Sequence, residues 1–226
     1  MKISKETLDV LKNFSAINPN LILKEGNVLS TIAEAKNIMA TTTVAETFPK
    51  EVGIYDLNEF LSALSLIEDA DLEFGESAVL ISSPMSSITY RYADKSILTS
   101  PEKAVNMPPS EIQVSLSAEI INQVRKAGAA LGHPVVSLMS EANDDKVFLQ
   151  VKDPNNTSAN TYQIDTGARV NDTFDLQFLI ANLKLIPGNY QVSVSSKLIS
   201  HWACNINNNP IEYWIALEKS STYTSV

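Results

Sequence analysis

The chain has 226 residues, a formal net charge of −9 and 44% hydrophobic residues. This length suits one large domain or two of ordinary size, and the apolar content can build a buried core. The negative charge argues against a protein that coats nucleic acid with its whole surface. A small basic face remains compatible with it, because salt screens exposed charges beyond about 10 Å. We expect neither a membrane span nor a signal peptide, since no stretch has the roughly 18 apolar residues or the apolar N-terminal core required.

The first half of the chain predicts a helix, strands, a second helix and more strands. Residues 3–17 form the first helix, with Ser4 as its N-cap. Asp56 caps the second helix, 57–67, and Glu59 completes a capping box. Gly26 sits in a turn, 25–27, that predicts a hairpin between the first two strands. The predicted strands of this half are 21–24, 28–33, 38–44, 52–55, 72–74, 79–82 and 87–92.

The second half repeats this order after a segment without periodicity, 94–109, which reads as a linker. Ser117 caps a predicted helix that ends at Leu131. Asp175 caps a second predicted helix, 176–186, which Pro187-Gly188 would end. The predicted strands are 135–139, 147–151, 161–166, 190–194, 198–206 and 211–217.

The two capped helices carry the same five-point apolar spacing, i, i+3, i+4, i+7 and i+10. The residues are Leu57, Phe60, Leu61, Leu64 and Ile67 in one, and Leu176, Leu179, Ile180, Leu183 and Ile186 in the other. We therefore predict an α+β chain of two similar domains, 1–108 and 109–226, each with antiparallel sheets and two helices on one face. The outer sides of the opening helices carry four bases: Lys5, Lys12, Arg125 and Lys126.

Enzymatic features are weak. The sequence has no phosphate-binding glycine-rich loop, and neither His133 nor His201 has a carboxylate or cysteine at metal-ligand spacing. An acidic turn at residues 68–73 could hold a cation, but such a turn is more often simply solvated. Cys204, the single cysteine, lies in an apolar run, is expected to be buried, and fits a reducing compartment. We expect no enzymatic activity, no metal and no cofactor.

Several stretches resemble the DNA polymerase sliding clamps of T-even-type bacteriophages. They are 2–17 (KISKETLDVLKNFSAI), 54–67 (IYDLNEFLSALSLI), 187–190 (PGNY) and 215–218 (IALE). The resemblance covers the whole length and is strongest in the first half; between residues 95 and 173 it is mostly one of pattern.

The resemblance implies a DNA clamp fold and a homotrimeric ring that encircles duplex DNA and serves as a processivity factor. It implies as partners the replicative DNA polymerase and an ATP-driven clamp loader, in the cytoplasm of an infected bacterial cell. It also implies a role as DNA-tracking activator of late viral transcription, with a late-transcription sigma factor and co-activator. A DNA-free scaffold that docks partner peptides is the alternative.

The resemblance also suggests three sets of site residues. The residues expected to face DNA are Lys5, Lys12, Arg125 and Lys126, with Lys184 as a weaker candidate. The expected partner-peptide pocket comprises Val105, Met107, Pro108 and Ile215. The expected subunit interface joins the edge strands that carry Ile88, Tyr90 and Tyr92 in one half and Tyr162 and Ile164 in the other.

Overall fold

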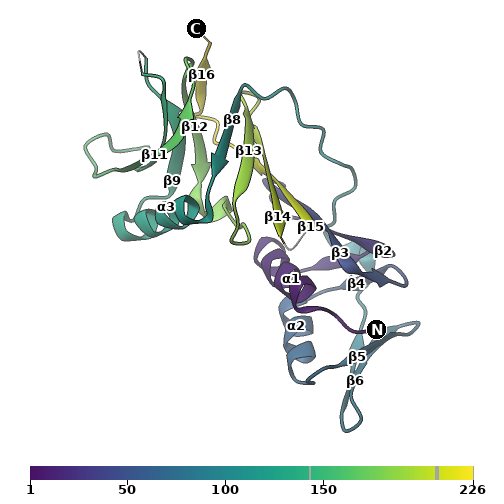
Figure 1. Cartoon of the computed structure of the whole chain (residues 1–226). Helices are drawn as coiled ribbons and strands as arrows, with labels where there is room; N and C mark the ends of the chain where they lie inside the picture. Colours follow the sequence, from purple (N-terminus) through teal and green to yellow (C-terminus); the bar gives the residue numbers. More distant parts are fainter. Residues whose placement is uncertain (143, 207–208, 226) are drawn as a thin grey trace. The chain divides into compact units, whose positions relative to one another are not determined.

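The computed structural model describes residues 1–142, 144–206 and 209–225. The chain divides into two compact units (Figure 1). The first unit contains Met1–Ala104 and Ile206–Ile211, and the second contains Val105–Asn205 and Glu212–Val226. None of the helices in the described ranges has the length and apolar character needed to span a membrane.

The strands of the first unit pair antiparallel. β1 (Leu21–Leu23) pairs with β4 (Val52–Ile54), and β2 (Gly26–Ile32) pairs with β3 (Ile38–Phe48). A separate three-stranded sheet has the order β5 (Asp71–Phe74), β6 (Ala78–Ser82) and β7 (Ser87–Arg91). The hairpin predicted at residues 25–27 is wrong. Gly26, at a φ of 104°, bends the chain between β1 and β2, which pair with different strands.

Two helices of the first unit lie side by side (Figure 1). α1 (Lys5–Ile17) begins at the predicted cap, where the Ser4 side chain accepts a hydrogen bond from the Thr7 amide. α2 (Leu57–Ser65) begins at Asp56, whose side chain accepts from two amides of the first turn. Both caps satisfy amides that have no partner inside the helix. A polar residue directly before an apolar stripe therefore predicted the start of each helix correctly.

The second unit contains two sheets. Its five-stranded sheet has the order β11 (Tyr162–Arg169), β10 (Lys146–Lys152), β9 (Val135–Ser140), β12 (Thr173–Leu179) and β16 (Thr222–Thr224). In the other sheet, β8 (Ile112–Leu116), β13 (Tyr190–Ser195), β14 (Ile199–Ile206) and β15 (Asn209–Ala216) are neighbours in that order. β15 starts in the first unit, where it follows β3 in the strand order. The sequence did not predict β8 and β16.

The helix predicted at residues 176–186 is wrong. Residues up to Leu179 form β12, which pairs with β9 on one side and β16 on the other, and only a 3-10 turn, η2 (Ile180–Asn182), follows. Phe174, Leu176 and Phe178 alternate into the core with at most 3% exposure. The stretch has apolar residues at both spacings, with Leu176 in each set, and pairing of its backbone with β9 and β16 makes it a strand. The second unit therefore has one α-helix among its described residues, not two.

That helix, α3 (Ala118–Leu131), begins at Ser117 as predicted and ends at Gly132, whose φ of 68° is left-handed. The sequence spacing predicts a buried stripe of Ile120, Val124, Ala127 and Leu131. The structure instead buries Ile121, Val124 and Gly128 and leaves Ile120 half-exposed. The buried stripe is thus rotated, and Arg125, which the sequence placed on the solvent side, is half-buried.

Candidate nucleic-acid interface

The outer face of α1 presents two of the predicted bases. Leu11 and Phe14 are buried on the opposite side of the helix. The side chains of Lys5 and Lys12 point away from the core, and they are 85% and 65% exposed. Asp9 lies between them on the same face. The helix thus offers exposed ammonium groups, which suit phosphate contact without base recognition.

On α3 the two predicted bases differ. Lys126 is exposed, but Arg125 is half-buried and its Nη2 donates to the backbone carbonyls of Leu183 and Leu185. Burial lowers the pKa of Arg125. Arg125 therefore links α3 to the segment after η2 through hydrogen bonds. Lys126 is the more exposed cation of the two.

Backbone hydrogen bonds from Leu183 and Lys184 to η2 hold the start of the segment 183–188, and side-chain hydroxyls hold its middle. Tyr190 donates to the carbonyl of Ile186 at 2.7 Å, and the hydroxyl of Tyr213 accepts from the Ile186 amide at 3.2 Å. Burial raises the pKa of both tyrosines well above the ordinary value. Lys184 lies in this segment, not on a helix, and is half-exposed. The structure places it next to the two carbonyls that Arg125 binds.

The polar face of α2 carries no base. Ser62 and Ser65 bond to carbonyls of their own helix at 2.7 Å, and Asn58 and Glu59 are exposed. The exposed face of α2 is therefore neutral to acidic.

The two strands expected at a subunit interface are both sheet edges in the described part of the chain. β7 ends the order β5-β6-β7, and β11 ends the order β11-β10-β9-β12-β16. In each strand half-buried and exposed residues alternate. Tyr90 packs edge-on against Phe60 of α2, and Tyr162 donates to Gln123 of α3 at 2.8 Å. The half-buried rows include Ile88 and Tyr90 of β7, with Tyr92 directly after that strand, and Tyr162 and Ile164 of β11.

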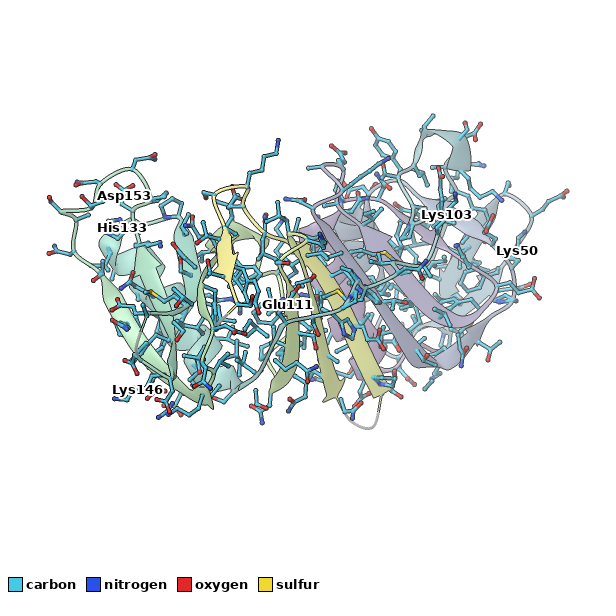
Figure 2. All side chains as sticks on the ribbon, turned by 90° about the horizontal axis from the view of Figure 1, so that it is seen from above. Lys50, Lys103, Glu111, His133, Lys146 and Asp153 are labelled. Atoms are coloured by element: carbon cyan, nitrogen blue, oxygen red, sulfur yellow. The ribbon has the colours of Figure 1, made fainter. Side chains whose placement is uncertain are left out.

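The expected peptide pocket divides into surface and core. Val105, Met107 and Pro108 are half-exposed in the extended segment before β8, but Ile215 is fully buried in β15. Hydrogen bonds fix the end of this segment, since Ser195 donates to the Pro109 carbonyl and the Glu111 carboxylate accepts from Ser196. Figure 2 shows Glu111 where the segment enters β8.

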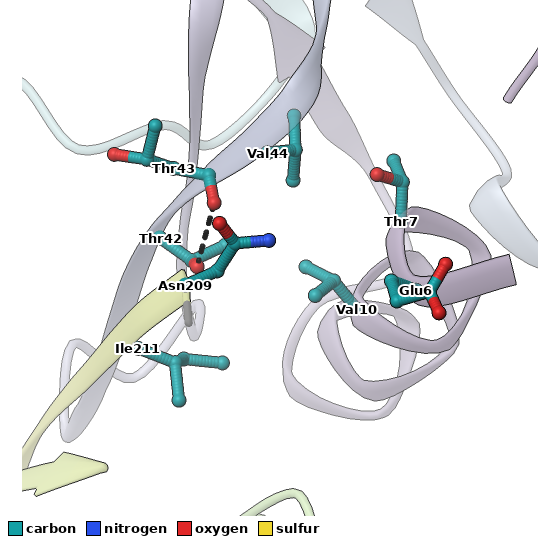
Figure 3. A pocket seen from close by; sticks show the side chains of 8 residues that line it. All are labelled: Glu6, Thr7, Val10, Thr42, Thr43, Val44, Asn209 and Ile211. Atoms are coloured by element: carbon teal, nitrogen blue, oxygen red, sulfur yellow. Dashed lines mark hydrogen bonds between the residues drawn. The ribbon is translucent and has the colours of Figure 1, made fainter. Parts of the chain in front are cut away.

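The described part of the first unit contains two small cavities, and one of about 110 Å³ lies between α1 and α2, lined by Leu8 and Leu64. Another cavity, of about 20 Å³, is lined by residues of α1 and β3. Figure 3 shows Thr7 and Val10 opposite Thr42 and Asn209 in it. It has space for about one water molecule. A larger cavity of about 420 Å³ in the second unit lies along α3 beside Arg125 and Pro187.

Known proteins resemble this chain at two levels. The sequence profile of the DNA polymerase processivity factors matches residues 4–101. The sliding clamp of Vibrio phage KVP40 is 31% identical over 223 residues, which cover 96% of this chain and 99% of that protein. The sliding clamp of Enterobacteria phage T4 is 30% identical over 229 residues, 99% of each chain.

The solved structures define the fold. The proliferating cellular nuclear antigen of Entamoeba histolytica superposes with a TM-score of 0.68 at 14% identity, over 94% of each chain. A. fulgidus PCNA, solved with the C-terminal region of FEN-1 bound, gives 0.69 at 12% identity over 95% of this chain and 96% of that one.

The chain combines antiparallel sheets with few helices and superposes on these clamps over nearly its whole length. It therefore has the DNA clamp fold. Within that class, the chain belongs to the sliding clamps of T4-like phages, which are DNA polymerase processivity factors.

Proposed function

We propose that the chain forms a ring that encircles duplex DNA and holds the viral replicative polymerase on its template. The observation that carries this proposal is the pair of exposed basic helix faces, with Lys5 and Lys12 on α1 and Lys126 on α3, in a chain that is related to phage sliding clamps over its whole length. Its net charge of −9 disfavours DNA binding elsewhere on the surface.

The ring closes as a homotrimer through the edges β7 and β11 of neighbouring copies. Each edge leaves backbone donors and acceptors on its outer side, and a strand from another copy can satisfy them. The half-buried rows, with Tyr90 on one edge and Ile164 on the other, would become buried in the joint.

The family relationship supports the partners that we propose. A hydrophobic peptide of the polymerase docks on the half-exposed segment around Val105, Met107 and Pro108. Ile215 is fully buried and is therefore not part of the docking surface. An ATP-driven loader opens the ring, late-transcription factors use it as a tracking activator, and the work takes place in the cytoplasm of the infected host. The chain acts as a scaffold and has no catalytic role.

The test of the DNA-facing role is the double variant Lys12→Glu with Lys126→Glu. Both side chains are exposed on helix faces, so the fold should survive. We expect weaker loading and shorter polymerase runs on primed DNA. The salt slope should fall by roughly 0.9 for each phosphate that the variant no longer binds.

A double variant with the same charge change outside the helices, Lys24→Glu with Lys219→Glu, is the matched control, since both lysines are exposed. Full processivity of the helix variant at physiological salt would exclude this face as the DNA contact. If peptide docking persisted without any DNA retention in the unmodified protein, a DNA-free docking scaffold would be the better description.

A further inference from the structure

The exposed face of α1 places a carboxylate between its two lysines. Lys5 Nζ lies 3.1 Å from Asp9 Oδ2, and Lys12 Nζ lies 3.8 Å from Asp9 Oδ1. All three side chains are on the outer side of the helix, and that of Asp9 is 46% exposed. We call these three residues the α1 ladder.

A DNA phosphate that approaches the α1 ladder must compete with the Asp9 carboxylate for the two lysines. Each lysine must exchange its contact with Asp9 for one with the phosphate, and the carboxylate left behind repels the incoming anion. Exposed ion pairs are weak, so the exchange is possible and fast. The Asp9 carboxylate reduces the net charge of the α1 ladder from two positive charges to one.

The second unit provides an internal comparison. α1 and α3 both start after a serine cap, Ser4 and Ser117. Counted from these caps, the position of Asp9 in α1 is occupied in α3 by Asn122, which is exposed and uncharged. Lys126, one turn beyond Asn122, therefore lacks the built-in carboxylate that Lys5 and Lys12 share.

We propose that Asp9 is a tuning residue that competes with DNA phosphates for Lys5 and Lys12 and so keeps the grip of α1 on DNA weak enough for sliding. This inference rests on the proposed DNA-facing role of α1. The partner it concerns is the phosphate backbone of any duplex, because no base contact is involved. The residue acts through the two lysines and does not itself bind DNA.

The experiment is Asp9→Asn, which removes the charge and keeps the size. Binding of the variant to a short duplex is measured over a salt series, and its diffusion along stretched DNA is followed by single-molecule tracking. We expect binding that is about threefold to tenfold tighter at low salt, a salt slope steeper by up to about 0.9 per subunit, and slower diffusion. The thermal midpoint should stay unchanged, since only exposed ion pairs are removed.

Two matched variants sharpen the test. Asn122→Asp places a carboxylate one turn before Lys126 and should weaken binding and speed diffusion. Glu102→Gln makes the charge change of Asp9→Asn on an exposed residue outside the helices, and should leave both readouts at wild-type values.

The outcomes distinguish tuning by Asp9 from the proposed DNA-facing role of α1. If Asp9→Asn behaves like Glu102→Gln while Lys12→Glu with Lys126→Glu weakens binding, tuning by Asp9 is wrong and the DNA face stands. If none of these helix variants changes DNA binding, the DNA face itself is wrong.

Discussion

Glu46 of β3 fastens the start of α1 to the sheet beneath it. Its carboxylate accepts hydrogen bonds from the Ser4 amide and the Thr7 hydroxyl. Partial burial alone would raise the pKa of Glu46, but these hydrogen bonds together outweigh it and hold the pKa below its ordinary value. The charged form therefore stabilises the helix that carries Lys5 and Lys12.

The pH dependence follows from the direction of that shift. Because the folded pKa lies below the ordinary value of 4.5, the stabilisation is complete at neutral pH and is lost as the pH falls from about 4.5 through the folded pKa. We expect Glu46→Gln to lower the free energy of unfolding at pH 7 by about 1 kcal/mol, with a smaller loss at pH 3. Urea titrations over this pH range measure it. Glu73→Gln on an exposed position of β5 is the control, and equal losses at both pH values would contradict the account.

At the scale of elements, Arg125 of α3 holds the segment that follows η2 in place. Replacement by glutamine leaves the carbonyls of Leu183 and Leu185 without their charged donor. We expect Arg125→Gln to cost about 1–3 kcal/mol of unfolding free energy, whereas Lys126→Gln should change it by less than about 0.5 kcal/mol. Thermal unfolding of both variants measures the difference. Equal midpoints would mean that these hydrogen bonds contribute nothing to stability.

The same segment shows what the sequence could and could not predict. Local rules located α1, α2 and α3, because Ser4, Asp56 and Ser117 satisfy amides within one turn of themselves. They failed at β12, because its choice between helix and strand depends on β9 and β16, which are distant in sequence.

Asp175 illustrates the reason for that failure. The sequence assigned it as a helix cap, but in the fold its carboxylate binds Lys152 of β10 at 2.6 Å. A cap is a local choice that a motif can reveal, whereas this pairing needs the register of β10, β9 and β12. The burial of Arg125 escaped prediction for the same reason. Its partners are carbonyls that face it only because the second predicted helix is absent.

For the whole molecule, ring closure through sheet edges makes a distinct prediction. Ile164→Lys places a charge in the half-buried row of β11, and Gln163→Lys places the same charge on the exposed side of the same strand. We expect the first variant to weaken self-association by about tenfold or more and the second to leave it near wild type. Sedimentation equilibrium over a concentration series measures this, with circular dichroism to confirm folding. Equal association constants for both variants would exclude this row from the joint.

The central claim, that the protein encircles duplex DNA, is tested most directly by topology. A linear duplex is fixed to a bead at one end, and its other end is either free or closed by a bulky protein block. With no loader present to open it, a closed ring can thread only over a free end, so the account predicts association with the free-ended DNA alone. It also predicts that a block added afterwards traps the bound protein against a wash in high salt, which removes purely electrostatic contacts. Equal binding to DNA blocked at both ends, lost in the high-salt wash, would contradict encirclement.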